Sequence, residues 1–151
     1  MNAEELATRL AGRSIAVAES LTAGNLQALI ASVSGASRYF LGGVTAYSID
    51  QKVSLLGVER SLAEPVNCVS EPVVLQMVAG IRRLTGADVG IATTGYAEAW
   101  GEIATPMAWI AVETSAGAVA ARVEAPGLDR VGVQQRIAHA ALQLAIEVLQ
   151  K

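Results

Sequence analysis

The sequence predicts a three-layer α/β/α sandwich built on a mixed β-sheet. Segments with apolar residues at helical spacing alternate along the chain with short runs of small and β-branched residues. Near the C-terminus, two such runs are joined by a short glycine-containing turn, which is typical of a β-hairpin. The alternation predicts helices on both faces of parallel strands, and the hairpin adds antiparallel strands to the same sheet. Because the 151 residues contain no linker or internal repeat, we expect one domain over residues 1–151.

The first half of the chain should contain three helices and two strands. In order, these are a helix over 3–11, a buried strand over 14–18, a helix that reaches about Val33, a strand over 38–47, and a short helix from Asp50. Gly12 and Gly57 are typical helix stops, and Asp50 is a typical N-cap. The pair Gly42–Gly43 is expected to bend the second strand.

The second half should contain two longer helices and three strands. In order, we expect a connection over 61–68, a helix from Ser70 to Gly86, a strand over 87–94, a loop over 95–105, strands over 107–114 and 119–124, and a closing helix over 129–151. Ser70 is a suitable N-cap, and Pro72 fits the first turn, where a missing N–H costs nothing. The length of the 95–105 loop makes it a candidate for function.

Composition excludes several classes of partner. The net charge of −3 gives no electrostatic footprint for nucleic acid. No apolar run is long enough to span a membrane. Since 52% of the residues are hydrophobic and only 17% are charged, we expect a large core and contacts between subunits of a homo-oligomer.

The few cysteine and histidine residues bear on metal binding and on compartment. One Cys and one His argue against a His/Cys metal site within the chain. The single Cys68 excludes an internal disulfide and suits a reducing environment. The N-terminal residues lack a basic region followed by an apolar one, so we expect no signal peptide and a cytoplasmic location.

The segment Ala18–Gly24 forms a predicted turn between the first strand and the following helix. Such a turn directs free backbone N–H groups and the positive end of the helix dipole toward a ligand, so it could bind an anion. Ser20 lies where a nucleophile could meet that ligand. The alternative is that Ser20 or Thr22 is only the N-cap of the helix.

Polar residues follow three predicted strands, and ligands of open α/β sheets bind at the carboxyl ends of strands. The three segments are Glu19–Ser20, Tyr47–Ser48 and Thr93–Gly95. Lys52 follows Tyr47 by about one helical turn and could lean over the same edge. A serine hydroxyl needs a base, and a desolvated, neutral lysine is one such base. Tyr47 could relay the proton or hold the lysine in place.

Each of these residues also has a purely structural interpretation. Lys52 could be a solvated lysine that pairs with Asp50 or Glu59. Tyr47 could be a half-buried strand aromatic. His139 has no local partner, which favours a packing or surface role over acid–base chemistry. Trp100 could stack on a ligand ring or fill a subunit contact.

Four motifs together resemble the CinA C-terminal domain family. They are residues 18–24 (AESLTAG), 46–52 (AYSIDQK), 69–72 (VSEP) and 94–95 (TG), and the resemblance extends from about Leu6 to Leu149. The family includes stand-alone nicotinamide-nucleotide amidases. It therefore implies an α/β/α sandwich that hydrolyses the carboxamide of nicotinamide mononucleotide to nicotinic acid mononucleotide and ammonia, in NAD salvage. We expect no cofactor, no metal, and no counterpart of the N-terminal domain of full-length CinA proteins.

The resemblance assigns roles to individual residues. Catalytic roles fall on Ser20 as nucleophile, Lys52 as base and Tyr47. The positions that match substrate-binding residues of the family are Thr22, Ala23, Gly24, Thr94, Gly95 and Arg130.

Several residues depart from the family pattern. Leu21 replaces a cysteine, Ala23 replaces a glycine, and Gln134 stands where a second arginine is usual. The glycine-rich family loop is rewritten over 95–102 and gains Glu98 and Glu102, which should weaken the binding of a nucleotide phosphate.

Three hypotheses follow from this combination. The first is a Ser–Lys amidohydrolase. The second is a catalytically weak or inactive paralogue that serves as a ligand-binding or regulatory module. The third is a structural oligomer, which predicts no accessible cavity between Ser20, Lys52 and Thr94.

Overall fold

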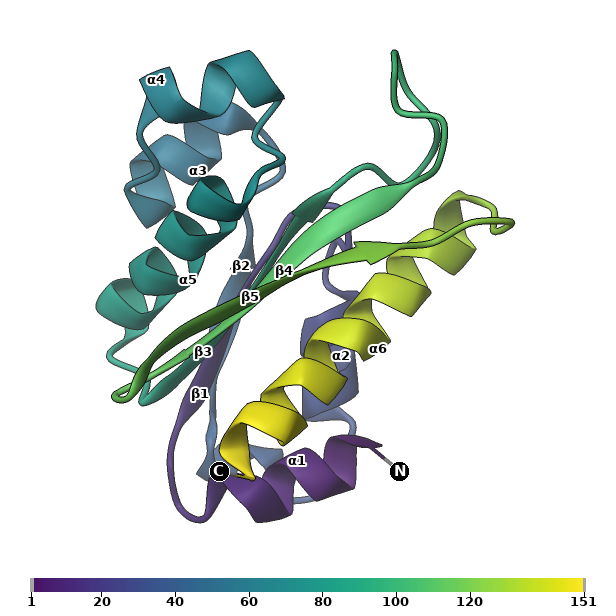
Figure 1. The fold of residues 1–151 in the computed structure, drawn as a ribbon. Coiled ribbons are helices and arrows are strands. Elements are labelled where there is room, and N and C mark those ends of the chain that lie inside the picture. The colour runs from purple at the N-terminus through teal and green to yellow at the C-terminus, as the bar shows by residue number, and fades with distance from the viewer. Residues whose placement is uncertain (1, 151) are drawn as a thin grey trace.

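The computed structural model describes residues 2–150 and contains a five-stranded mixed sheet between two layers of helices (Figure 1). The strands are β1 (Ile15–Glu19), β2 (Phe40–Thr45), β3 (Val89–Gly95), β4 (Met107–Thr114) and β5 (Gly117–Glu124). The helices are α1 (Asn2–Leu10), α2 (Asn25–Ala31), α3 (Ile49–Leu56), α4 (Arg60–Ala63), α5 (Glu71–Thr85) and α6 (Arg130–Leu149). The predicted fold class is confirmed.

The strand order β2-β1-β3-β4-β5 places the carboxyl ends of three strands at one edge. Strands β2, β1 and β3 are parallel, whereas β4 and β5 form the expected antiparallel hairpin. Between β1 and β2 the register slips by one residue next to Gly42, whose φ of +134° few side chains tolerate. Where a bend at the glycine pair was predicted, the structure therefore has a shift in register just before Gly42.

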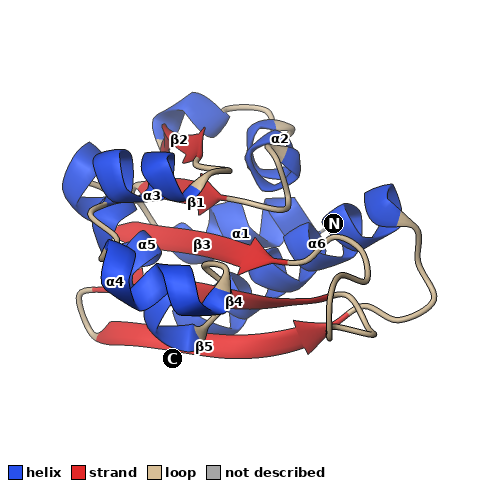
Figure 2. Ribbon diagram, turned by 90° about the horizontal axis from the view of Figure 1, so that it is seen from above, coloured by secondary structure: helices blue, strands red, loops and turns tan. Residues whose placement is uncertain are grey.

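Helices lie on both faces of the sheet, as Figure 2 shows from above, and each face is covered by one apolar cluster. The larger cluster joins α1, α2 and α6 to one face through side chains such as Leu26, Ile91 and Ile137. The smaller cluster packs α5 and the end of α3 on the other face, which presents the small side chains of Ala16, Ala18 and Ala92. These alanines let α5 approach the sheet closely. None of the helices formed by residues 2–150 is both long and apolar enough to cross a membrane.

Two local predictions were wrong. The N-cap of α3 is Ser48, whose hydroxyl accepts a hydrogen bond from the Gln51 amide, and Asp50 instead pairs with Arg60 at 2.6 Å. The segment expected to be an irregular connection forms α4 and the 3₁₀ helix Glu64–Val66. A short helix of this kind has too few residues for a periodic apolar pattern, so its sequence does not indicate it.

Candidate active site

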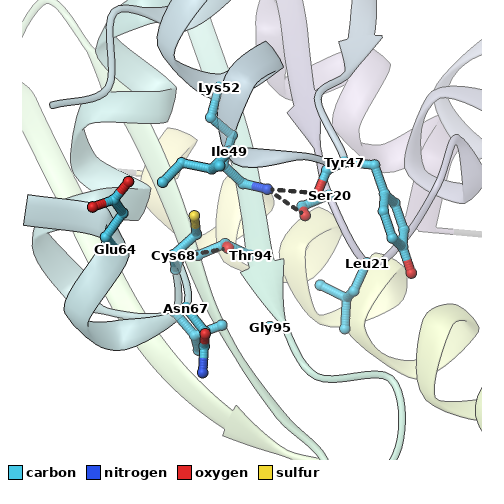
Figure 3. A pocket seen from close by; sticks show the side chains of 11 residues that line it. Ser20, Leu21, Tyr47, Ile49, Lys52, Glu64, Asn67, Cys68, Thr94 and Gly95 are labelled. Atoms are coloured by element: carbon cyan, nitrogen blue, oxygen red, sulfur yellow. Dashed lines mark hydrogen bonds between the residues drawn. The ribbon is translucent and has the colours of Figure 1, made fainter. Parts of the chain in front are cut away.

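A cavity of about 330 Å³ opens where β1, β2 and β3 end (Figure 3). The lining residues come from the turn after β1, the segment from Tyr47 into α3, the loop before α5, and the end of β3. They are Ser20, Leu21, Tyr47, Ile49, Lys52, Glu64, Asn67, Cys68, Val69, Thr94 and Gly95. The structural-oligomer hypothesis predicted that no such cavity exists between Ser20, Lys52 and Thr94, and that prediction was wrong.

Ser20 and Lys52 are in direct contact inside this cavity. The Nζ of Lys52 donates a hydrogen bond to Ser20 Oγ at 2.9 Å and to the carbonyl oxygen of Tyr47 at 3.1 Å. Lys52 is only 2% exposed and Ser20 only 6%. No carboxylate among residues 2–150 forms an ion pair with Lys52, so it is not the solvated lysine that the alternative interpretation expected.

Burial controls the proton affinity of this lysine. Desolvation lowers the pKa of Lys52, because the charged ammonium loses its water, and the nearby Cys68 opposes the shift to a smaller extent. A lowered pKa increases the fraction of neutral amine at a given pH. The neutral amine of Lys52 no longer has to act as the donor in its contact with Ser20 Oγ. It can instead accept the proton of the Ser20 hydroxyl.

The turn that carries Ser20 is held by its neighbours in the sheet. Thr93 Oγ1 accepts a hydrogen bond from the Ser20 amide at 3.3 Å and lies 2.8 Å from the Thr22 hydroxyl. All three residues are buried. The serine is thus fixed to the adjacent strand β3, and the sequence reasoning did not assign this supporting role to Thr93.

The N-terminus of α2 does not form the expected anion site. The Glu19 carboxylate, fully buried, accepts hydrogen bonds from the amides of Leu26 at 2.9 Å and Gln27 at 3.0 Å. The N-cap residue is Gly24, with φ +97° and no side-chain cap. The interpretation of Ser20 or Thr22 as N-cap was therefore wrong as well, because an internal carboxylate satisfies these amides.

The phenol of Tyr47 points away from Lys52 and Ser20 (Figure 3). Its hydroxyl instead accepts a hydrogen bond from Arg130 Nη2, and Arg130 Nη1 donates to Glu98 Oε1 at 3.0 Å. Tyr47 is 53% exposed and contributes its backbone carbonyl, not its phenol, to the lysine. A proton relay through this phenol is not in place in the structure.

The comparisons with known proteins agree with this architecture. A family model described as the CinA C-terminal domain matches residues 2–149. The chain belongs to the CinA C-terminal domain family. A CinA-like protein of Chlorobium limicola is 40% identical over an alignment of 145 positions that covers 91% of this chain and 34% of that protein. A CinA-like protein of Mycolicibacterium vanbaalenii is 40% identical over an alignment of 144 positions that covers 93% of this chain and 34% of that protein.

Solved structures of the CinA superfamily share the whole fold. The competence damage-inducible protein A of Klebsiella pneumoniae superposes with a TM-score of 0.92 at 31% identity, covering 99% of this chain and 95% of that one. A CinA superfamily protein from Enterobacter cloacae superposes with a TM-score of 0.92 at 29% identity. The match covers 98% of this chain and 90% of that one. The chain spans at most about a third of the length of the curated relatives named above.

Only part of the substrate-binding set carried over from the CinA family lines the cavity. Thr94 and Gly95 do, and the Thr94 hydroxyl donates to the Cys68 carbonyl at 2.7 Å. Gly95 is required for packing, since a Cβ there would lie 2.5 Å from the Ala108 Cβ and from the Met107 carbonyl. Four predicted residues lie outside the lining: Thr22, Ala23, Gly24 and Arg130.

Two cavity-lining residues of the loop before α5 were not predicted from the sequence. Asn67 and Cys68 both line the cavity and both have left-handed backbones, with φ of +51° and +63°. Burial raises the pKa of the Cys68 thiol, and Lys52 opposes that shift. The only sequence signal for this loop was its position just before the Ser70 cap, which places it near the cavity once α5 packs on the sheet.

The remaining candidates lie away from Ser20. Trp100 stacks on Tyr96, with ring centroids 6.1 Å apart and planes at 14°, and is 59% exposed. His139 lies on the exposed part of α6, where its Nδ1 is 2.8 Å from the Gln135 carbonyl. Within residues 2–150 no group of three or more His, Cys, Asp or Glu side chains could hold a metal ion.

Proposed function

We propose that this CinA-family chain is a Ser–Lys amidohydrolase that acts on a linear carboxamide, of the nicotinamide-nucleotide amidase type. The observation that carries the proposal is the 2.9 Å contact between Lys52 Nζ and Ser20 Oγ inside a cavity. A buried lysine without a carboxylate partner among the described residues contributes little to stability, so its place beside a hydroxyl is better explained by chemistry.

In the proposed reaction, neutral Lys52 removes the proton from Ser20 Oγ as this oxygen attacks the carboxamide carbon. The peptide N–H of Leu21, next to the nucleophile in the cavity wall, is the candidate to stabilise the developing oxyanion. The lysine ammonium then gives its proton to the leaving nitrogen, which departs as ammonia. Water, activated by the same lysine, hydrolyses the acyl-serine ester and releases the carboxylic acid.

The substrate proposed first is nicotinamide mononucleotide, with nicotinic acid mononucleotide and ammonia as products. Its basis is the family resemblance of the segments that carry Ser20 and Lys52. The Tyr47 carbonyl keeps the lysine directed at the serine, which gives this residue a positioning role.

Ammonia release from nicotinamide mononucleotide tests the proposal. The unaltered chain should release ammonia, and Ser20→Ala should reduce the rate by at least about a thousand-fold, because removal of the nucleophile leaves only binding effects. Ser54→Ala is a matched control, since Ser54 is exposed on the same helix as Lys52. A Ser20→Ala variant with undiminished activity would refute the nucleophile. Saturable binding without turnover would favour the binding-module hypothesis.

A further inference from the structure

The cationic groups around the cavity are already paired with carboxylates of the chain. Arg130 pairs with Glu98 at 3.0 Å and donates a hydrogen bond to the hydroxyl of Tyr47, a residue that lines the cavity. Arg60 pairs with Asp50 at 2.6 Å and with Glu64 at 3.7 Å. A phosphate that approaches either guanidinium would therefore compete with a carboxylate that is already bound there.

The other two positive features are also occupied. The amides at the start of α2 donate to Glu19. Lys52 is buried, and its amine donates hydrogen bonds to Ser20 Oγ and to the Tyr47 carbonyl. The cavity lining itself adds a negative group, Glu64. The site therefore contains the proposed Ser20–Lys52 pair, and each cationic group named above already has a hydrogen-bond or ion-pair partner within the described residues.

We infer that the cavity favours a carboxamide without a phosphate group, so that the mononucleotide is a poorer substrate than the corresponding riboside, and that Glu98 causes this preference by pairing with Arg130. The inference rests on the proposed amidohydrolase function and specifies its substrate class. A phosphate monoester carries between one and two negative charges near neutral pH, and in the cavity it would meet Glu64 while Arg130 is already paired with Glu98. The riboside of the same carboxamide lacks the phosphate and carries only the positive charge of its pyridinium ring, so it meets no such repulsion.

Two residues of the same loop provide a matched test. Glu98 and Glu102 carry the same charge, but only Glu98 contacts Arg130, and Glu102 forms no ion pair or hydrogen bond with any residue the structure describes. Glu98→Gln removes the competing carboxylate, whereas Glu102→Gln removes an equal charge nearby. The double variant Glu98→Gln/Arg130→Gln tests whether any gain depends on the freed guanidinium.

The experiment compares kcat/KM for nicotinamide riboside and nicotinamide mononucleotide, which differ only in the phosphate. The unaltered chain should use the riboside at least as efficiently as the mononucleotide. Glu98→Gln should shift the ratio toward the mononucleotide by on the order of ten-fold, since one repulsion is removed and one charge-assisted contact is gained. Glu102→Gln should change it by less than about two-fold because solvent screens a distant exposed charge, and the double variant should lose the gain.

Two outcomes would overturn the inference: a higher kcat/KM of the unaltered chain for the mononucleotide than for the riboside, or equal responses to Glu98→Gln and Glu102→Gln. Calorimetric binding of both ligands in the Ser20→Ala background separates this failure from failure of the proposed function. If no variant with Ser20 releases ammonia, the amidase proposal fails. The ratio of the two Kd values, and its change in Glu98→Gln, then decides the phosphate selection by itself.

Discussion

The Nζ of Lys52 and the Oγ of Ser20 approach to 2.9 Å although the residues lie 32 positions apart, on α3 and at the end of β1. The contact exists because parallel strands end at the same edge and because Ser48 starts α3 directly beyond β2. Several measurable consequences depend on this pair and on the structure that supports it.

The pH dependence of turnover should follow Lys52. Burial lowers the pKa of its amine, so the neutral base is present at lower pH than for an exposed lysine. We expect kcat/KM for amide hydrolysis to rise with pH and to reach its plateau below the range where exposed lysines deprotonate. Lys52→Arg should abolish the activity at every pH, because arginine remains protonated. A profile with a midpoint in the ordinary lysine range would contradict this role.

Stability should also depend on pH through Lys52. Between the lowered pKa of the folded state and the ordinary pKa of the unfolded chain, the unfolded chain binds a proton that the folded protein lacks. The free energy of unfolding should therefore rise with pH across this window. Lys52→Met, which keeps an unbranched side chain, should remove that rise. Urea unfolding of both proteins at several pH values measures the difference, and parallel curves would exclude it.

Removing the Glu19 carboxylate should destabilise the fold. Glu19→Ala leaves the buried N–H of Leu26 and the partly buried N–H of Gln27 without their acceptors. We expect a loss of about 2–3 kcal/mol in the free energy of unfolding, as for other hydrogen bonds to charged groups. Glu5→Ala is the control, because Glu5 forms only an exposed ion pair with Arg9, and it should cost less than about 0.5 kcal/mol. Equal losses would disprove the capping role.

Gly80 should be essential for the position of α3. A Cβ at this residue would lie 2.1 Å from the carbonyl oxygen of Leu56, the last residue of α3, so α5 and α3 cross in backbone contact. Gly80→Ala should cost about 1–3 kcal/mol and should lower turnover by moving Lys52 relative to Ser20. Leu84→Ala, on the exposed side of α5, should change stability by less than about 0.5 kcal/mol. Full activity and stability in Gly80→Ala would contradict the tight crossing.

Ala23 should be a site where glycine stabilises the protein. Its φ of +49° lies in the left-handed region, where a Cβ costs about 1–2 kcal/mol. After the greater freedom of glycine in the unfolded chain is subtracted, Ala23→Gly should gain about 0.5–1 kcal/mol. Ala28→Gly, in the following helix α2, should instead lose about 1 kcal/mol. Thermal unfolding of the two variants should therefore shift in opposite directions.

The sequence predicted the fold well because its signals are local and repeated. Caps such as Ser70 and stops such as Gly86 mark α5 on both sides, and the structure places the helix between them. The approach of Ser20 and Lys52 was expected because ligands of such sheets bind where parallel strands end. The direction of the Tyr47 side chain was not expected, because a residue just beyond a strand can direct its phenol to either side of the sheet. Here the hydrogen bond from Arg130 determines the direction.

Contacts between polar groups that lie far apart in the chain could not be predicted from the sequence. Glu19 stands next to Ser20 in the sequence, but nothing local indicates that its carboxylate turns to α2. Nothing in the sequence distinguishes Glu98 from Glu102, which are glutamates of the same loop. Only the fold shows that Glu98 is the one that pairs with Arg130. The sequence did not indicate that Asn67 and Cys68 line the cavity. Both have left-handed backbone conformations, which are rare at residues other than glycine and are therefore not expected from the sequence.

The hydroxyl of Thr93 joins the Ser20 amide and the Thr22 side chain to a central strand of the sheet. The proposed nucleophile is thus preorganised during folding, before any ligand arrives. Ligand binding then requires little rearrangement at the reacting atom, and adaptation to new substrates can be confined to the Gly95–Thr105 loop. Substitutions in this loop should therefore leave the position of the Ser20 hydroxyl unchanged.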